Sequence, residues 1–333
     1  MRKLNVAVLM GGKSSEREVS LTSGRMIMEA LDTAKYNSFA VDTACFGGIE
    51  LDAAAAKFAS GAEGVVYTLD HLVAGVGTRP DVVFIALHGR FGEDGTVQGM
   101  LELLGIPYVG SGVLASAIAI DKLMSRKIFH ADGIPIAKGF GVERSSSVAD
   151  IRSRVRQELG FPVVVKPSRE GSSIGLSIVQ QEDEFESALC EAFRHDKDVL
   201  LEEYISGIEI TAPVIGNDDL KALPLIEILP AHEFYDYHSK YADGGSEHVI
   251  PARIGSELST IAQELAIQCH RSLGCRGMSR TDMIVRGQDI FVLEVNTIPG
   301  MTSTSLLPQS AKAIGIEFPE LLDTLIGYAL EKG

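Results

Sequence analysis

Two long apolar runs stand out in the first third of the chain. Residues 4–10 and 81–87 are almost continuously apolar, which is the pattern of strands in a parallel sheet covered on both faces. Each run is followed by a glycine-containing loop and then by a helical pattern, over residues 19–31 and 97–104. This order predicts an α/β unit with a parallel sheet over residues 1–120.

The rest of the chain alternates shorter strand and helix patterns. Strands are predicted over residues 134–142, 162–167, 198–205, 207–216 and 221–229, and helices over 122–132, 147–159, 183–193, 256–273, 305–314 and 317–330. In the helix over 256–273, the apolar residues at helical spacing predict the face that packs on the core: Leu258, Ile261, Leu265, Cys269 and Leu273. We place two further units at residues 121–211 and 212–333.

Residues 280–305 carry polar side chains on a predicted strand pair. If this hairpin folds about Gln288, Asp282 lies opposite Glu294. Arg280 then lies opposite Asn296, and all four side chains share one face. The other face, predicted to pack on the core, carries Met283, Val285, Phe291, Leu293 and Val295. Two carboxylates and an amide oxygen suit a hard cation such as Mg²⁺, although a solvated hairpin with cross-strand ion pairs fits the same pattern.

Composition and charge narrow the class of protein. The net charge of −15 over 333 residues argues against nucleic acid as the main partner. No apolar run approaches the roughly 20 residues that span a bilayer. The four cysteines lack metal-type spacing, and the N-terminal apolar run leads directly into a Gly-Gly turn without a cleavage site. These features predict a cytoplasmic protein that binds neither membrane nor nucleic acid.

Two loops of the first unit carry candidate ligand-binding residues. The loop after the first strand, GGKSSEREVS, lacks the GxGxxG pattern of dinucleotide-binding proteins. Its Glu16 suits a ligand's ammonium group, and the alternative is that it caps the following helix and complements its dipole. The strand over 81–87 is followed by His88 and Gly89. A loop at this end of the strand faces the crevice where open α/β sheets bind ligands.

Two further loops of the chain have binding character. Lys166 ends a β-branched strand, and the small residues 171–175 follow it in a turn whose amides could approach phosphate oxygens. An ordinary hairpin turn is the alternative. The polar, aromatic segment over 231–254 has the length and composition of a lid or binding loop.

Seven segments of the sequence, taken in their order along the chain, form a pattern typical of one protein family. They are GGKSSEREVSLTSG, HGRFGEDGTVQGMLELLGIPYVGSG, DKLMSRK, VVVKPSREGSSIG, FYDYHSKY, SRTDM and LEVNTIPGMTSTSL. Together they resemble the ATP-grasp ligases, and more narrowly the D-alanine–D-alanine ligases. The resemblance implies an N-terminal Rossmann-like domain followed by a two-domain ATP-grasp fold. It also implies that ATP and two D-alanine molecules react through an acylphosphate to form the dipeptide used in peptidoglycan synthesis.

The resemblance also implies roles for individual residues. The metal ligands would be Asp282, Glu294 and Asn296, holding two Mg²⁺ ions, with Mn²⁺ as an alternative. The ATP site would comprise Lys122, Lys166, Ser172, Ser173, Glu202, Ile205, Glu209 and Lys240, with Glu202 and Ile205 at the adenine and Glu209 at the ribose. The family commonly has lysine where this chain has Glu203. A glutamate that faces the nucleotide would lower the affinity for ATP, whereas one that faces solvent would not change it.

The remaining roles concern D-alanine and catalysis. Glu16 would bind the first D-alanine's ammonium, with His88 nearby, and Lys240, Ser305 and Leu306 would bind the second D-alanine. Arg280 and the Gly300 amide would stabilise the oxyanion, and Tyr241 and Ser172 would latch a lid to Glu16. The family also implies a homodimer. The alternatives are a D-alanine–D-lactate ligase, a dinucleotide-dependent oxidoreductase and a non-catalytic nucleotide-binding module.

Overall fold

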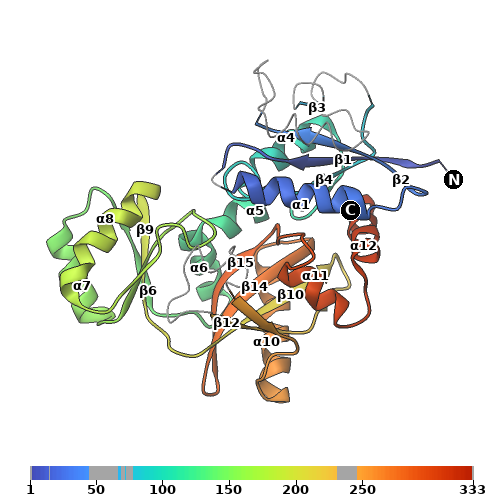
Figure 1. The fold of residues 1–333 in the computed structure, drawn as a ribbon. Helices are drawn as coiled ribbons and strands as arrows, with labels where there is room; N and C mark the ends of the chain where they lie inside the picture. The colour runs from blue at the N-terminus through green and yellow to red at the C-terminus, as the bar shows by residue number, and fades with distance from the viewer. Residues whose placement is uncertain are drawn as a thin grey trace.

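The fold is built on three sheets that follow one another along the chain (Figure 1). The structure is a computed structural model, and it describes residues 2–14, 16–44, 67, 68, 72, 78–230 and 246–331. The first sheet is parallel, and the strand pairs of the second and third sheets are antiparallel. The α/β fold class predicted from the sequence is therefore confirmed.

The first sheet is buried on both faces. Its strands are ordered β3 (Tyr67–Thr68), β2 (Tyr36–Asp42), β1 (Leu4–Met10), β4 (Val82–Ile85) and β5 (Tyr108–Val109), with helices α1 (Arg17–Ala30), α4 (Thr96–Leu104) and α5 (Val113–Ile120). Val6 and Val8 pack into one hydrophobic core, whereas Ala7 and Leu9 pack into another. The two cores lie on opposite faces because successive side chains of a strand alternate in direction. This double burial explains the continuous apolar runs in the sequence.

The second sheet is a four-stranded antiparallel layer. Its strands are ordered β6 (Gly139–Glu143), β9 (Asp198–Glu203), β7 (Val163–Pro167) and β8 (Ser177–Val179), with helices α7 (Val148–Glu158) and α8 (Phe185–His195) and a short 3-10 helix (Glu182–Glu184). Helix α6 (Lys122–Ala131) precedes it. Asp121 caps α6 by accepting from two backbone amides, and Gly133 follows the helix with φ +70°.

The third sheet carries the polar hairpin. Its strands are ordered β13 (Ser246–Val249), β12 (Ile226–Pro230), β10 (Ile208–Gly216), β14 (Gly277–Arg286) and β15 (Asp289–Asn296), and the short β11 (Lys221–Ala222) also pairs with β10. The strand predicted over 221–229 is therefore two strands. The division placed between residues 211 and 212 falls inside β10, because this strand of the third sheet already begins at Ile208.

Helix α10 (Ser256–Ser272) packs on the third sheet through a face that the sequence identified only in part. The buried face comprises Leu258, Ala262, Ala266, Cys269 and His270, followed by Leu273 beyond the helix end. Ile261, predicted to lie on this face, is 40% exposed, and Leu265 is only partly buried. The sequence reading favoured large apolar residues, but two alanines make this contact because they let the helix approach the sheet closely.

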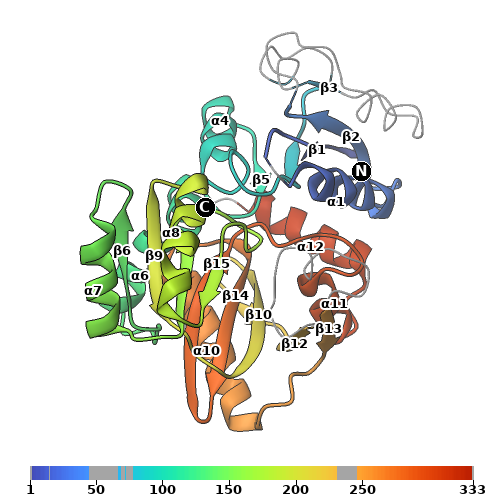
Figure 2. The same ribbon diagram turned by 60° about the vertical axis from the view of Figure 1, so that its left-hand side comes forward.

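The C-terminal helices return to the first sheet. Helix α11 (Leu306–Lys312) is followed by α12 (Phe318–Leu330), which lies below α1 in both views (Figures 1 and 2). Leu321, Leu322 and Leu325 of α12 share one hydrophobic core with Val6 and Phe84 of the first sheet. The two ends of the chain thus stabilise each other. Over the described ranges, every helix falls short of the length and apolar character required to cross a membrane.

Candidate active site

A cavity of about 410 Å³ lies between the second and third sheets. One wall comes from β7, β8 and β9, and the other comes from β12, β14 and β15. Eight residues singled out in the sequence line it: Lys122, Lys166, Ser173, Glu202, Ile205, Glu209, Asp282 and Glu294. Ile178, Ile228 and Leu293 lie among them. Apolar walls with a few converging charges are typical of a pocket for a small organic ligand.

Glu202 forms the centre of a buried ion triad in the cavity wall. Its Oε2 lies 2.6 Å from Lys166 Nζ, and its Oε1 pairs with the Arg126 guanidinium, which also donates to the Ala137 carbonyl at 2.6 Å. Glu202 is only 3% exposed, so these two cations provide the compensation that a buried carboxylate needs. The sequence reading missed Arg126, although the DKLMSRK segment that carried the resemblance contains it.

Lys122 connects the cavity to the hairpin carboxylates. It is the first residue of α6, and its Nζ lies 3.1 Å from Glu294 Oε2 while donating to the Glu170 carbonyl at 2.7 Å. The side chain is 8% exposed. A buried ammonium beside the hairpin that carries Asp282 and Glu294 is suited to binding a polyanionic ligand.

The β14–β15 hairpin has the register predicted for its polar face, but its apolar face differs. Asp282 pairs with Glu294 and Arg280 with Asn296, as expected. The register then shifts between Asp282 and Met283, because Leu293 is an extra residue in the ladder. The core face is therefore Met283, Val285, Ile290, Val292 and Val295. The prediction was wrong for Phe291, which is only partly buried, and for Leu293, which lines the cavity.

Asp282 is held firmly on this hairpin. Arg280 forms a fork with it through Nε at 2.9 Å and Nη2 at 2.8 Å, and Thr211 Oγ1 donates to Oδ1 at 2.5 Å. The Asn296 side chain accepts from the Ile298 amide at 3.1 Å. In the part of the chain that the structure describes, no three His, Cys, Asp or Glu residues gather as a metal site. The candidate ligands are instead the carboxylates of Asp282 and Glu294, which lie opposite each other in the ladder, and the amide oxygen of Asn296. Mg²⁺ accepts oxygen ligands of these kinds.

Glu16 contacts the loop over residues 171–175, which we call the glycine loop, rather than its own helix. It occupies the N-cap position of α1, yet its side chain makes no capping bond there. Its Oε1 instead accepts from Ser172 Oγ, 156 positions away in the sequence. A Cβ atom at Gly89 would lie 2.8 Å from Glu16 Oε2, and one at Gly171 would lie 3.3 Å from it. Two loops therefore enclose the carboxylate, which is 5% exposed.

A histidine and a second acid lie close to Glu16. Burial lowers the pKa of His88, Arg280 lowers it further, and Glu16 opposes both effects. Burial and the nearby Glu16 raise the pKa of Glu93 to about 8, although the Gly89 amide donates to it at 2.6 Å. The sequence reading passed over Glu93 as part of a helix-opening loop. Its position directly after Gly92, the second glycine of that loop, was the signal available in the sequence.

Gly300, Ser305 and Leu306 lie at and before the start of α11. Ser305 lies at the N-cap of α11, but its Oγ accepts from the Thr302 amide at 3.0 Å and lies 2.8 Å from Thr302 Oγ1. A Cβ atom at Gly300 would lie 2.8 Å from Ser305 Oγ, so the structure brings these residues together. Leu306 begins the helix.

The remaining residues with an expected role or effect are Lys240, Tyr241 and Glu203. Lys240 and Tyr241 lie outside the described residues, as does most of the predicted lid. Glu203 lines the cavity, and its Oε1 accepts from the Lys138 amide at 2.8 Å. That bond fixes a carboxylate in the cavity lining, where the resemblance led us to expect an ammonium.

Comparison with family models gives two matches that together span most of the chain. A model described as D-ala D-ala ligase N-terminus matches residues 5–111, and one described as D-ala D-ala ligase C-terminus matches residues 128–327. A D-alanine–D-alanine ligase from Syntrophobacter fumaroxidans is 49% identical over 99% of this chain and 98% of its own length.

Solved structures of ligases also match this chain over nearly its whole length. The D-alanine–D-alanine ligase from Bacillus anthracis complexed with ATP is 34% identical, with a TM-score of 0.78 over 98% of this chain and 97% of that one. The VanG D-Ala:D-Ser ligase from Enterococcus faecalis is also 34% identical, with a TM-score of 0.83 over 99% of this chain and 100% of that one. The two-domain ATP-grasp fold implied by the resemblance is thereby confirmed.

Proposed function

Because the chain belongs to the D-alanine–D-alanine ligase family, we propose that its cavity binds ATP and that the adjoining region around Glu16 binds the first D-alanine. The family catalyses the ATP-dependent ligation of D-alanine to D-alanine for peptidoglycan synthesis. The contact between Glu16 and Ser172 supports the proposal, since it joins a buried carboxylate of the first unit to the loop whose Gly171 and Ser173 line the cavity.

The proposed ATP site uses the two sheets as opposite walls. Glu202 and the backbone near Ile205 would read the adenine edge, and Glu209 would bind the ribose hydroxyls. Glu202 retains acceptor capacity beyond its bonds to Lys166 and Arg126, because a carboxylate offers about four lone-pair sites. Lys122 and Lys166 would bind phosphates, and the loop over residues 171–175, with the Ser172 and Ser173 hydroxyls, would cover them.

Asp282, Glu294 and Asn296 would hold two Mg²⁺ ions between the hairpin and the phosphates. Their donor chemistry supports this role, and Asp282 and Glu294 face each other across the ladder. The bound ions would neutralise charge on the transferring phosphoryl group. Lys122 contacts Glu294, so its ammonium would add to the positive charge beside the phosphates.

In the first step, a carboxylate oxygen of the first D-alanine attacks the γ-phosphorus, and the bond from phosphorus to the ADP oxygen breaks. Glu16 would hold the ammonium of this substrate in place. The second D-alanine, whose carboxylate Ser305, Leu306 and Lys240 would bind, then attacks the acyl carbon through its amine. Arg280 and the Gly300 amide would stabilise the tetrahedral oxyanion until phosphate leaves and a proton is released.

The unit boundaries, the lid latch, the oligomeric state and the cellular location stay predictions. We propose that the first unit ends near residue 120 and the second near residue 211, and that Tyr241 latches the lid to Ser172. A homodimer and a cytoplasmic location are predicted by the resemblance and the composition. The dinucleotide-dependent oxidoreductase and the non-catalytic module lose their support, because the matching relatives are ligases over the whole length.

The test is phosphate release with ATP, Mg²⁺ and a panel of D- and L-amino acids and D-lactate, with dipeptide measured alongside. We expect one phosphate per dipeptide with D-alanine and no turnover with L-amino acids. An ester product with D-lactate at a comparable rate would favour the D-alanine–D-lactate alternative. Absence of D-alanine-dependent phosphate release would refute the assignment of the site.

A further inference from the structure

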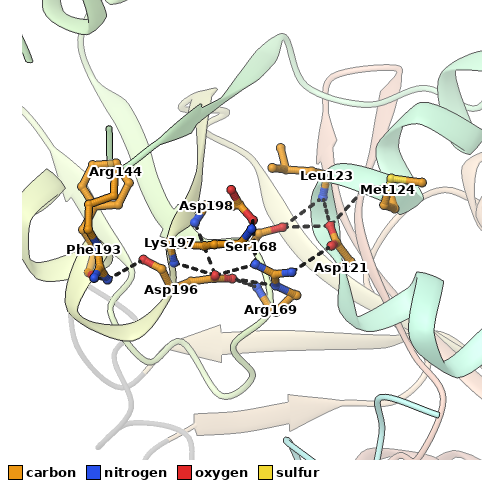
Figure 3. Close-up of polar contacts among 10 residues, drawn as sticks. All are labelled: Asp121, Leu123, Met124, Arg144, Ser168, Arg169, Phe193, Asp196, Lys197 and Asp198. Atoms are coloured by element: carbon orange, nitrogen blue, oxygen red, sulfur yellow. Dashed lines mark hydrogen bonds and ion pairs between the residues drawn. The ribbon is translucent and has the colours of Figure 1, made fainter. Parts of the chain in front are cut away.

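A cluster of charged and polar residues lies at the root of the glycine loop (Figure 3). Arg169 stands between the end of β7 and the loop, and we call it and its partners the Arg169 cluster: Asp121, Ser168, Arg169, Asp196 and Asp198. The described lining of the cavity includes none of the five. Contact with a ligand in that cavity therefore does not explain the cluster.

Arg169 is fixed to the second sheet through both its backbone and its side chain. Its amide and its Nε each donate to Asp196 Oδ2 at 3.0 Å, and its Nη2 donates to Asp196 Oδ1 at 2.7 Å. The same Nη2 lies 2.6 Å from Asp198 Oδ2, at the first residue of β9. Burial would raise the pKa of Asp196, but the bonds from Arg169 and two backbone amides outweigh it and lower the pKa. The carboxylate thus stays charged and holds the arginine.

The cluster also fixes the start of α6. Ser168 Oγ donates to Asp121 Oδ1 at 2.9 Å, and the same oxygen accepts from the Leu123 and Met124 amides at 3.1 Å each. The Lys122 amide donates to the Ser168 carbonyl at 3.0 Å. Lys122 is therefore tied to the loop root through its backbone.

The side chain of Lys122 adds a second connection, because its Nζ donates to the Glu170 carbonyl at 2.7 Å. Beyond Glu170 the loop adopts left-handed backbone at two serines, with φ +51° at Ser172 and +60° at Ser173. Residues other than glycine adopt this conformation at an energetic cost and keep it only where the surroundings impose it. The rigid root supplied by the cluster is such a constraint.

We propose that Arg169 is a positioning residue that fixes the separation between Lys122 and the glycine loop, and that it thereby sets affinity for the β- and γ-phosphates of ATP without touching them. This inference rests on the proposed function. Without the guanidinium, Asp196 and Asp198 would lose the cation that lies between them, and the loop root would lose its side-chain tie to the second sheet. Lys122 and the loop would still be joined through Ser168 and Glu170, but the root that carries both would no longer be fixed to β9.

The experiment compares Arg169→Met and Arg169→Lys with a matched control, Arg156→Met. Arg156 donates to Glu182 at 2.8 Å through Nε and pairs with it through Nη2 as well, on the same unit but away from the loop. Binding of ATP, ADP and AMP is measured by calorimetry with Mg²⁺, and circular dichroism checks that each variant is folded. AMP reports the adenosine end of the site and lacks the two phosphates in question.

We expect Arg169→Met to weaken ATP and ADP about tenfold and to leave AMP binding unchanged, whereas Arg156→Met changes none of them. Arg169→Lys keeps the charge but loses the fork, so it should restore part of the affinity. Equal weakening of all three nucleotides, or of none, would overturn the inference. Failure of the wild-type protein to bind ATP would instead overturn the proposed function, and the inference with it. If Arg169→Met does not fold, Asp196→Asn takes its place, because it keeps the shape of the carboxylate and weakens the same anchor.

Discussion

Replacing Glu16 by glutamine separates two roles for a carboxylate at the start of a helix. A helix-dipole role would contribute about 0.3–1 kcal/mol to stability and nothing to catalysis. The structure favours the other role, because the side chain bonds to Ser172 and does not cap α1. The substitution keeps the shape of the side chain and removes its charge.

The magnitude follows from the burial of the carboxylate. Glu16 is 5% exposed, and a hydrogen bond to a charged group contributes about 1.5–3 kcal/mol. Loss of one such bond to the ammonium of the first D-alanine corresponds to a roughly 10- to 100-fold rise in the apparent KM for that substrate. The KM for ATP should hold within about twofold, since the cavity lining does not include Glu16.

The assay is steady-state phosphate release as a function of D-alanine at saturating ATP. Glu18→Gln is the matched control, because Glu18 is an exposed acid in the first turn of the same helix. It removes the same charge from the same helix end without approaching the glycine loop. An unchanged D-alanine KM in Glu16→Gln, with a melting temperature lowered as much as in Glu18→Gln, would return Glu16 to the dipole role.

Three other substitutions or conditions probe separate parts of the structure. Glu294→Gln should abolish turnover and leave the fold intact, because it removes a ligand charge without changing shape, and near-normal activity at saturating Mg²⁺ would contradict the metal assignment. Glu202→Gln should lower the free energy of unfolding by about 3–5 kcal/mol, because Lys166 and Arg126 lose their buried partner; an unchanged denaturation midpoint would argue against that pairing. Burial lowers the pKa of His270 to about 4, below the ordinary 6.5, so stability should fall as the pH drops from 6.5 to 4, where only the unfolded chain takes up the proton. The loss should approach roughly 3 kcal/mol, since each pH unit between the two values counts about 1.4 kcal/mol, and His270→Gln should flatten the slope.

Local patterns in the sequence determined much of this protein. Alternation along two strands sufficed to pair Asp282 with Glu294 and Arg280 with Asn296, because strand periodicity is fixed by backbone geometry. The start of α6 at Lys122 was equally readable, since a helix start depends on the residues of one turn. Continuous apolar runs predicted a sheet buried on both faces for the same local reason.

The tertiary structure decided what local patterns leave open. The bulge at Leu293 reverses the side chains beyond it and moves that residue from the core into the cavity. Ile261 faces outward because packing against the sheet favoured two alanines over a larger residue. In both cases the deciding contact comes from another element, so no window of sequence contains it.

The composition of the site itself is the clearest such case. Glu16 meets Ser172 across 156 positions, and Arg126 meets Glu202 across 76. The sequence supplied the residue types and their order, and the resemblance implied their roles. Only the closed fold brings a helix start, a glycine loop and a strand together, because burial of their apolar faces fixes where the polar ends meet.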